Sequence, residues 1–158
     1  MIYTSKQLFY LLRWRMGEPA CTAAVRWAGK KSLEKVWFSC PRADWLLWLA
    51  ARLGVSRTLM LRAVRGCLKL APKKTRMELL KYLDRESFCF SLWSDVDSAA
   101  YGAADAEALG FSFRRWDIAY RRSLKNMARV VRAFIKFEII QKKVGEMEKK
   151  FAIKKKKK

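Results

Sequence analysis

Residues 38–54 read FSCPRADWLLWLAARLG and contain a run of seven consecutive apolar residues, WLLWLAA. Proline is tolerated in a first helical turn and disfavours helix for the residue before it, so we expect a helix to begin at Pro41. Asp44 then lies in the first turn, where its carboxylate opposes the positive end of the helix dipole. Gly54 ends the helix. A helix that is apolar on every side is typical of a central position, so this stretch predicts a core helix with Arg42 and Asp44 at its solvent-side entrance.

On both sides of this stretch, apolar residues recur every three or four positions, which is the periodicity of amphipathic helices. Strand-like alternation is hard to find. Capping residues, glycines and prolines divide the chain into separate helices. The aromatic segment 87–97 gives no clear assignment. The expected helices cover residues 4–15, 18–28, 32–40, 41–53, 56–71, 75–85, 97–109 and 112–151.

The last expected helix is the longest, and its apolar residues form one stripe suited to packing along a bundle. The lysine run at 154–158 has low complexity, which predicts disorder. We therefore predict an all-α fold, a compact multi-helix bundle in three regions. These are a helical core domain over 1–111, a long amphipathic basic helix over 112–151 packed on that core, and a disordered polybasic tail over 152–158.

Charge is the strongest functional signal in the sequence. The chain holds 35 Lys and Arg against 14 Asp and Glu, a formal net charge of +21. Such a surface repels itself and attracts anionic partners. The excess is greatest toward the C-terminus, where no acidic residue occurs between Asp117 and Glu138. Seven basic residues of this region are candidates for nucleic-acid binding: Arg121, Arg122, Lys125, Arg129, Arg132, Lys136 and Lys143.

Other interpretations of these patterns stay open. A basic stripe is also the solvated side of an ordinary amphipathic helix, and arginines alone do not distinguish RNA from DNA. Apolar residues beside lysines over 134–140 also resemble an interfacial membrane helix followed by a polybasic anchor. Arg42 and Asp44 either pair with charges on neighbouring helices or form a patch for a partner. Burial explains Trp45 and Trp48 more simply than base stacking does.

Catalysis and metal binding have little support in the sequence. The chain has no histidine, and its four cysteines contain no Cys-x-x-Cys pair. Helix capping and solvation explain the neighbouring acids better than a cation site does; these acids are Asp95, Asp97, Asp105 and Glu107. We expect no catalytic residue, no metal and no cofactor. We expect the thiols to be free and mostly buried, and we expect neither a leader nor a membrane span. These expectations suit the cytoplasm of a bacterial host.

The stretch 20–54, ACTAAVRWAGKKSLEKVWFSCPRADWLLWLAARLG, combines an alanine-cysteine helix, a Trp-x-x-Cys element and a Cys-x-Arg-x-Asp-Trp-x-x-Trp-Leu run. This pattern resembles the immunity-five-like domain, found in helical proteins of phages and bacteria. The resemblance implies an all-helical, non-enzymatic protein of a phage or mobile element that binds another protein or a nucleic acid. The residues that carry it are Cys21, Trp27, Trp37, Cys40, Arg42, Asp44, Trp45, Trp48 and Leu49.

The sequence therefore predicts a small phage or mobile-element protein that binds an anionic partner through its basic C-terminal helix. That partner is nucleic acid or a host nucleoprotein complex, and binding it would suit an inhibitor of a host defence system. The alternative is a protein-binding module, or an immunity-like inhibitor, that docks a host protein or self-associates without nucleic acid. Steep salt dependence of binding distinguishes the first from the second.

Overall fold

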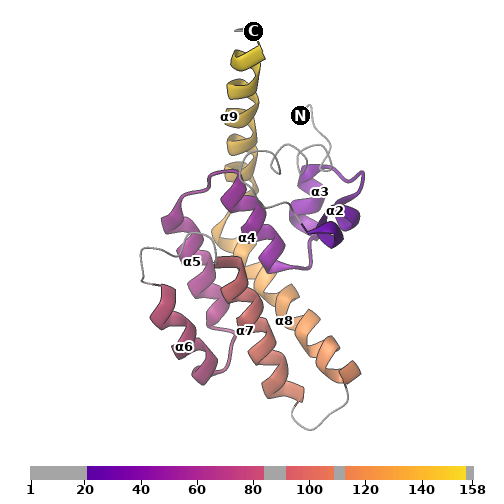
Figure 1. The fold of residues 1–158 in the computed structure, drawn as a ribbon, viewed down its shortest axis with the longest axis vertical. Coiled ribbons are helices and arrows are strands. Elements are labelled where there is room, and N and C mark those ends of the chain that lie inside the picture. The colour runs from indigo at the N-terminus through magenta and orange to yellow at the C-terminus, as the bar shows by residue number, and fades with distance from the viewer. Residues whose placement is uncertain (1–20, 84–91, 109–112, 156–158) are drawn as a thin grey trace.

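The computed structural model describes residues 21–83, 92–108 and 113–155, and this part of the chain forms eight α-helices and no strand (Figure 1). The all-α prediction is confirmed. The helix expected over 4–15 and the fourth cysteine, Cys89, lie outside the described residues. The helices are α2 (Thr22–Ala28), α3 (Leu33–Ser39), α4 (Ala43–Arg52), α5 (Arg57–Leu68), α6 (Lys73–Leu83), α7 (Leu92–Ala108), α8 (Phe113–Phe134) and α9 (Phe137–Lys155).

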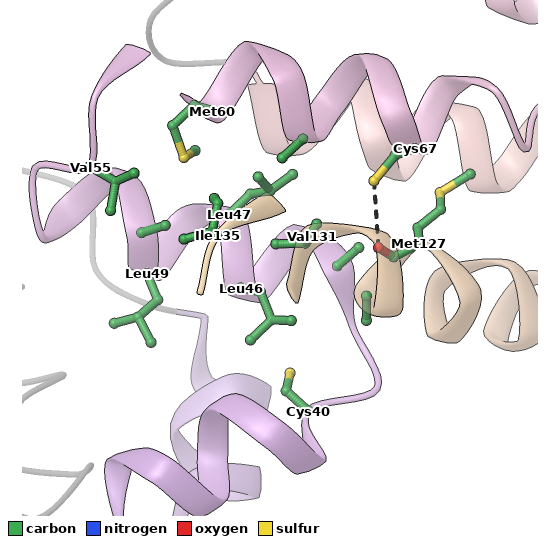
Figure 2. Close-up of a cluster of buried hydrophobic side chains, with 14 of the residues drawn as sticks. Cys40, Leu46, Leu47, Leu49, Val55, Met60, Cys67, Met127, Val131 and Ile135 are labelled. Atoms are coloured by element: carbon green, nitrogen blue, oxygen red, sulfur yellow. Dashed lines mark hydrogen bonds between the residues drawn. The ribbon is translucent and has the colours of Figure 1, made fainter. Parts of the chain in front are cut away.

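Helix α4 is the central helix that its apolar run predicts. It packs against α5, α7 and α8, and its residues Leu46, Leu47 and Leu49 are buried. Figure 2 shows these leucines in one cluster with Met60 of α5 and side chains from α8. The helix begins at Ala43 with Arg42 as its N-cap residue, two positions later than expected. The predicted core position is confirmed.

The tryptophans of the opening stretch lie at the boundary of the core rather than inside it. Trp45 and Trp48 are partly buried and pack against the core cluster, whereas Trp37 of α3 is fully buried. The ring of Trp45 lies 6.1 Å from that of Trp27. Each amphipathic indole therefore stays partly exposed to solvent while it packs against the core cluster, as is common for this side chain.

Helices α5 and α8 approach each other closely at a glycine. A Cβ atom on Gly66 would lie 2.6 Å from Cε2 of Phe134 and 2.8 Å from Cγ1 of Val130. The next residue of α5 is Cys67, whose thiol donates a hydrogen bond to the Met127 carbonyl of α8 at 3.5 Å (Figure 2). The absence of a side chain at Gly66 therefore sets the distance between the two helices.

The single helix expected over 112–151 is wrong, because the segment forms two helices that break at Ile135 and Lys136. The spacing of the buried residues explains the break. Ile135 and Ile140 are five positions apart, and a continuous helix would place them about 140° apart around its axis. The break instead leaves Ile135, Ile140 and Val144 all buried.

Helix α9 continues upward from the body in Figure 1, on the opposite side from the start of α8. It extends to Lys155 and so includes the first residues of the segment that we expected to be a tail. Residues 156–158 lie outside the described part of the chain. None of the described helices is both long enough and apolar enough to cross a membrane.

Candidate nucleic-acid interface

Four of the predicted basic residues share one exposed face of α8. Arg121, Arg122, Lys125 and Arg129 follow one another at intervals of one, three and four residues, which places them on one side of the helix. All four are exposed. The opposite side of α8 is held in the core by buried residues, among them Leu124, Met127 and Val131. The cations are therefore displayed from a helix whose position is fixed by packing.

Two of these cations have local polar contacts that leave them accessible. Arg121 Nε lies 2.8 Å from Oδ2 of Asp117, one turn earlier, and the arginine side chain is 77% exposed. Arg129 Nη1 donates to Asn126 Oδ1 at 3.5 Å. Exposed ion pairs of this kind contribute little to stability because water and salt screen them. A phosphate group would therefore compete readily with Asp117 for Arg121.

Arg132 has a different environment from its neighbours on α8. Its Nη1 donates hydrogen bonds to the Cys40 carbonyl at 2.9 Å and to the Trp37 carbonyl at 3.3 Å. These carbonyls belong to the C-terminal end of α3, which carries the negative end of the helix dipole. Burial lowers the pKa of Arg132. The structure therefore places Arg132 as a link between α8 and α3.

The remaining two predicted residues follow the break between α8 and α9. Lys136 is exposed in the break itself, close to the end of the α8 face. Lys143 lies on α9, where its Nζ pairs with Glu146 Oε2 at 2.9 Å, and its side chain is largely covered. The break thus separates Lys143 from the row on α8, so the seven predicted residues do not form one continuous surface.

Arg42 and Asp44 form part of a polar network rather than an open patch. Arg42 donates to both carboxylate oxygens of Asp44, at 3.0 and 2.7 Å, and to Oδ1 of Asp97 on α7 at 3.3 Å. The Tyr120 hydroxyl of α8 donates to the same Asp97 oxygen. Asp44 is buried, so the expected solvent-side entrance is wrong for this residue. Of the two alternatives left open by the sequence, pairing with neighbouring helices is the one observed.

The groups in this network shift each other's protonation. Burial opposes the charge on Arg42, but the hydrogen bonds to Asp44 and the charge interactions with Asp44, Tyr120 and Asp97 together outweigh that effect, so its pKa is raised. Burial and the hydrogen bond to Asp97 raise the pKa of Tyr120 to about 12. Both groups therefore keep their protons at neutral pH. The network joins α4, α7 and α8 as a fixed set of hydrogen bonds.

A row of aromatic rings near the start of α8 was not predicted from the sequence. Phe113 and Trp116 stack with ring centroids 6.1 Å apart and planes 18° apart, and Trp116 stacks on Tyr120 at 5.2 Å and 11°. Tyr101 of α7 meets Trp116 edge-on at 4.8 Å. Phe113 is 81% exposed. We define Phe113, Trp116, Tyr120 and Tyr101 as the aromatic row. The sequence signal that could have revealed this row is Phe113 followed directly by Arg114 and Arg115.

Two acids of α7 hold this row in place instead of capping a helix. Trp116 Nε1 donates to Asp105 Oδ1 at 2.7 Å, and Asp97 accepts from Tyr120 as described above. Because α7 begins at Leu92, Asp97 lies within the helix, and its expected role as an N-cap is wrong. Within the described ranges, no group of three Cys, Asp or Glu residues is placed to hold a metal ion.

A shallow groove of about 500 Å³ borders the basic face. It lies between the turn that joins α5 to α6 and the neighbouring parts of α7 and α8. Arg122 and Asn126 belong both to its wall and to the exposed side of α8. The groove therefore connects the basic face with the α5–α6 turn. Its lining is Leu70, Ala71, Pro72, Ala103, Arg122, Ser123 and Asn126.

No family model, no curated protein and no solved structure shows significant similarity to this chain. The resemblance to the immunity-five-like domain stays a prediction that rests on the motif between residues 20 and 54. The function must therefore be argued from the surface that the fold displays.

Proposed function

We propose that this protein binds nucleic acid, alone or within a nucleoprotein complex, through the basic face of α8. The observation that carries the proposal is the exposed set of Arg121, Arg122, Lys125 and Arg129 on one rigid face. Asp117 pairs with Arg121 at its start, and no acidic residue occurs in the sequence from 118 to 137. Several cations on one side of a helix suit the repeated phosphates of a nucleic-acid backbone, which supply most of the sequence-independent affinity.

Positive charges at helix starts add independent support. The first turns of α5, α6 and α8 contain no acid. They instead carry Arg57, the pair Lys73 and Lys74, and the pair Arg114 and Arg115. A cation near the positive end of a helix dipole is destabilising by roughly 0.3–1 kcal/mol. A bound polyanion would relieve this repulsion, so the arrangement favours an anionic partner.

A second candidate function is protein binding, favoured by an exposed aromatic side chain on α3. Phe38 is 56% exposed, and its ring contacts that of Phe137 at 5.4 Å. This patch lies on a different helix from the basic face, so separate variants test the two functions. The phage origin stays a prediction that follows from the motif resemblance. Action against a host defence stays a prediction that follows, by analogy, from the positive charge.

Binding to labelled duplex DNA, single-stranded DNA and RNA, measured over a range of salt concentrations, tests the proposal. If the α8 face contacts four phosphates, log affinity falls with log salt at a slope of about −3 to −4. Replacing Arg121, Arg122, Lys125 and Arg129 together by Gln removes most of that slope and lowers the affinity at least tenfold.

The matched control replaces four exposed cations elsewhere by Gln: Arg26, Lys30, Lys35 and Lys81. It removes the same net charge from α2, α3, α6 and the α2–α3 loop, and should retain most of the affinity and the slope. Equal losses in both variants would show diffuse attraction by net charge rather than a face on α8. Unchanged binding in the α8 variant would reject the proposed interface.

A further inference from the structure

Phe113 is an exposed ring without an evident structural role. It is 81% exposed, so burial in the core does not explain it, and the ring contact recorded for it within the described residues is with Trp116. Large exposed apolar side chains often mark a contact with a partner. Here the exposed ring ends a stack of parallel rings, so a further flat ring placed on Phe113 would extend that stack.

The rings beneath Phe113 are held in fixed orientations. Trp116 is bound through its Nε1 to Asp105, Tyr120 through its hydroxyl to Asp97, and Tyr101 contacts the Trp116 ring edge-on. Ligands lose less affinity to ordering when the receiving side chains are already rigid. The aromatic row is therefore a preorganised stacking surface.

Exposed cations continue from this row along α8. Arg114 and Arg115 follow Phe113 directly, and the basic face begins at Arg121. From Phe113 to Arg129 the helix rises about 24 Å, at 1.5 Å per residue. The acids Asp97 and Asp105 lie on the α7 side of the row and are engaged with its rings. A phosphate backbone would therefore follow the arginines on the other side.

We infer that the nucleic acid bound by α8 is single-stranded, and that one of its bases stacks on Phe113 while its phosphates follow the basic face. The inference rests on the proposed function. Paired bases within a duplex stack on each other and expose only their edges, so a protein ring reaches a base face there only by unstacking the duplex, whereas the faces of unpaired bases are accessible. Aromatic side chains beside a basic track are the usual means of binding single strands without sequence preference.

The test compares 12-nucleotide oligothymidine with a 12-base-pair duplex in direct binding assays of the full chain. Phe113→Ala should weaken binding of the single strand about 5- to 100-fold, the range for loss of one stacked base. It should leave duplex binding unchanged. The salt slope should also be unchanged, because no phosphate contact is removed. Phe113→Trp should restore single-strand affinity, since a larger ring stacks at least as well.

Phe38→Ala is the matched control, because it removes an exposed phenyl ring from α3 and should not alter binding to either probe. Both phenylalanines are exposed, so folding should survive each change, which circular dichroism checks. Preferential duplex binding with no effect of Phe113→Ala would overturn this inference while leaving the basic face intact. Equal weakening of both probes would also overturn it. If neither probe binds, the proposed function fails as well.

Discussion

Arg129 and Arg132 lie three positions apart on α8, yet their surroundings give them different roles. Arg129 is exposed and contacts only Asn126 among the hydrogen bonds described above. Arg132 is partly buried and binds two carbonyls at the end of α3. Sequence spacing alone assigns both residues to one basic stripe. The difference arises because α3 packs beside one edge of that stripe.

Replacing Arg132 by Gln should lower the free energy of unfolding by about 1–3 kcal/mol, because it removes hydrogen bonds from a charged donor and leaves two α3 carbonyls without that donor. Arg129→Gln should change it by less than about 0.5 kcal/mol. Urea denaturation of the two variants measures both values. Equal stability of the two proteins would show that the link to α3 contributes nothing.

The buried thiols make stability depend on alkaline pH. Burial raises the pKa of Cys40 to about 11 and that of Cys67 to about 12. The unfolded chain therefore loses these protons first, from about pH 9, so unfolding becomes more favourable as the pH rises.

Between pH 8.5 and pH 10.5 the free energy of unfolding should fall by about 1–2 kcal/mol for each buried thiol. Cys67→Ala should reduce this pH-dependent loss, although it lowers stability at every pH by leaving a small cavity. Urea denaturation at both pH values gives the comparison. An identical pH-dependent loss in the variant would contradict the role given to Cys67.

At the scale of the element, the crossing of α5 and α8 depends on Gly66. In Gly66→Ala the new methyl group would overlap Phe134 and Val130, so we expect a loss of about 1–3 kcal/mol. Gly145 is the matched control, because nothing lies within 4 Å of a Cβ atom there. Gly145→Ala should stabilise α9 by roughly 0.5–1 kcal/mol. Thermal denaturation of both variants tests the pair, and a stabilising effect of Gly66→Ala would refute the close approach.

Helix positions could be predicted from the sequence where local signals decide them. Ser32 accepts a hydrogen bond from Lys35 and caps α3 as expected, and Gly54 adopts the positive φ of 78° that glycine tolerates after α4. The break after α8 does not follow from a spacing of three or four residues, because the next fully buried residue after Ile135 is Ile140, five positions on. A continuous helix would turn Ile140 away from the core, and the break keeps both residues buried.

The candidate site was predictable only in part. Cations on α8 are visible in the sequence because their spacing is local. Met77 lies on the apolar side of the helix expected over 75–85, yet it is half exposed, and Phe113 shares its spacing with buried residues of α8. Which members of an apolar stripe are covered depends on how far the neighbouring helix extends. The reach of a neighbouring helix is a property of the tertiary structure, and the periodicity of the sequence does not predict it.

At the scale of the whole molecule, the formal net charge of +21 acts against the compact state. Adding NaCl from 20 to 200 mM should therefore raise the melting temperature, because salt screens repulsion between exposed cations. The network of Arg42, Asp44 and Asp97 is partly covered and should be screened less. Differential scanning calorimetry measures the shift. A falling melting temperature would show that attractive ion pairs outweigh the repulsion.

The bond between Arg132 and the end of α3 also has a consequence during synthesis. It joins residues 92 and 95 positions apart in the chain, and α8 supplies Leu124, Met127 and Val131 to the same core that α4 occupies. A growing chain that has emerged from the ribosome only through α7 lacks one wall of this core. The leucines of α4 are enclosed only after α8 has left the ribosome, and until then the nascent chain stays open to chaperones and proteases.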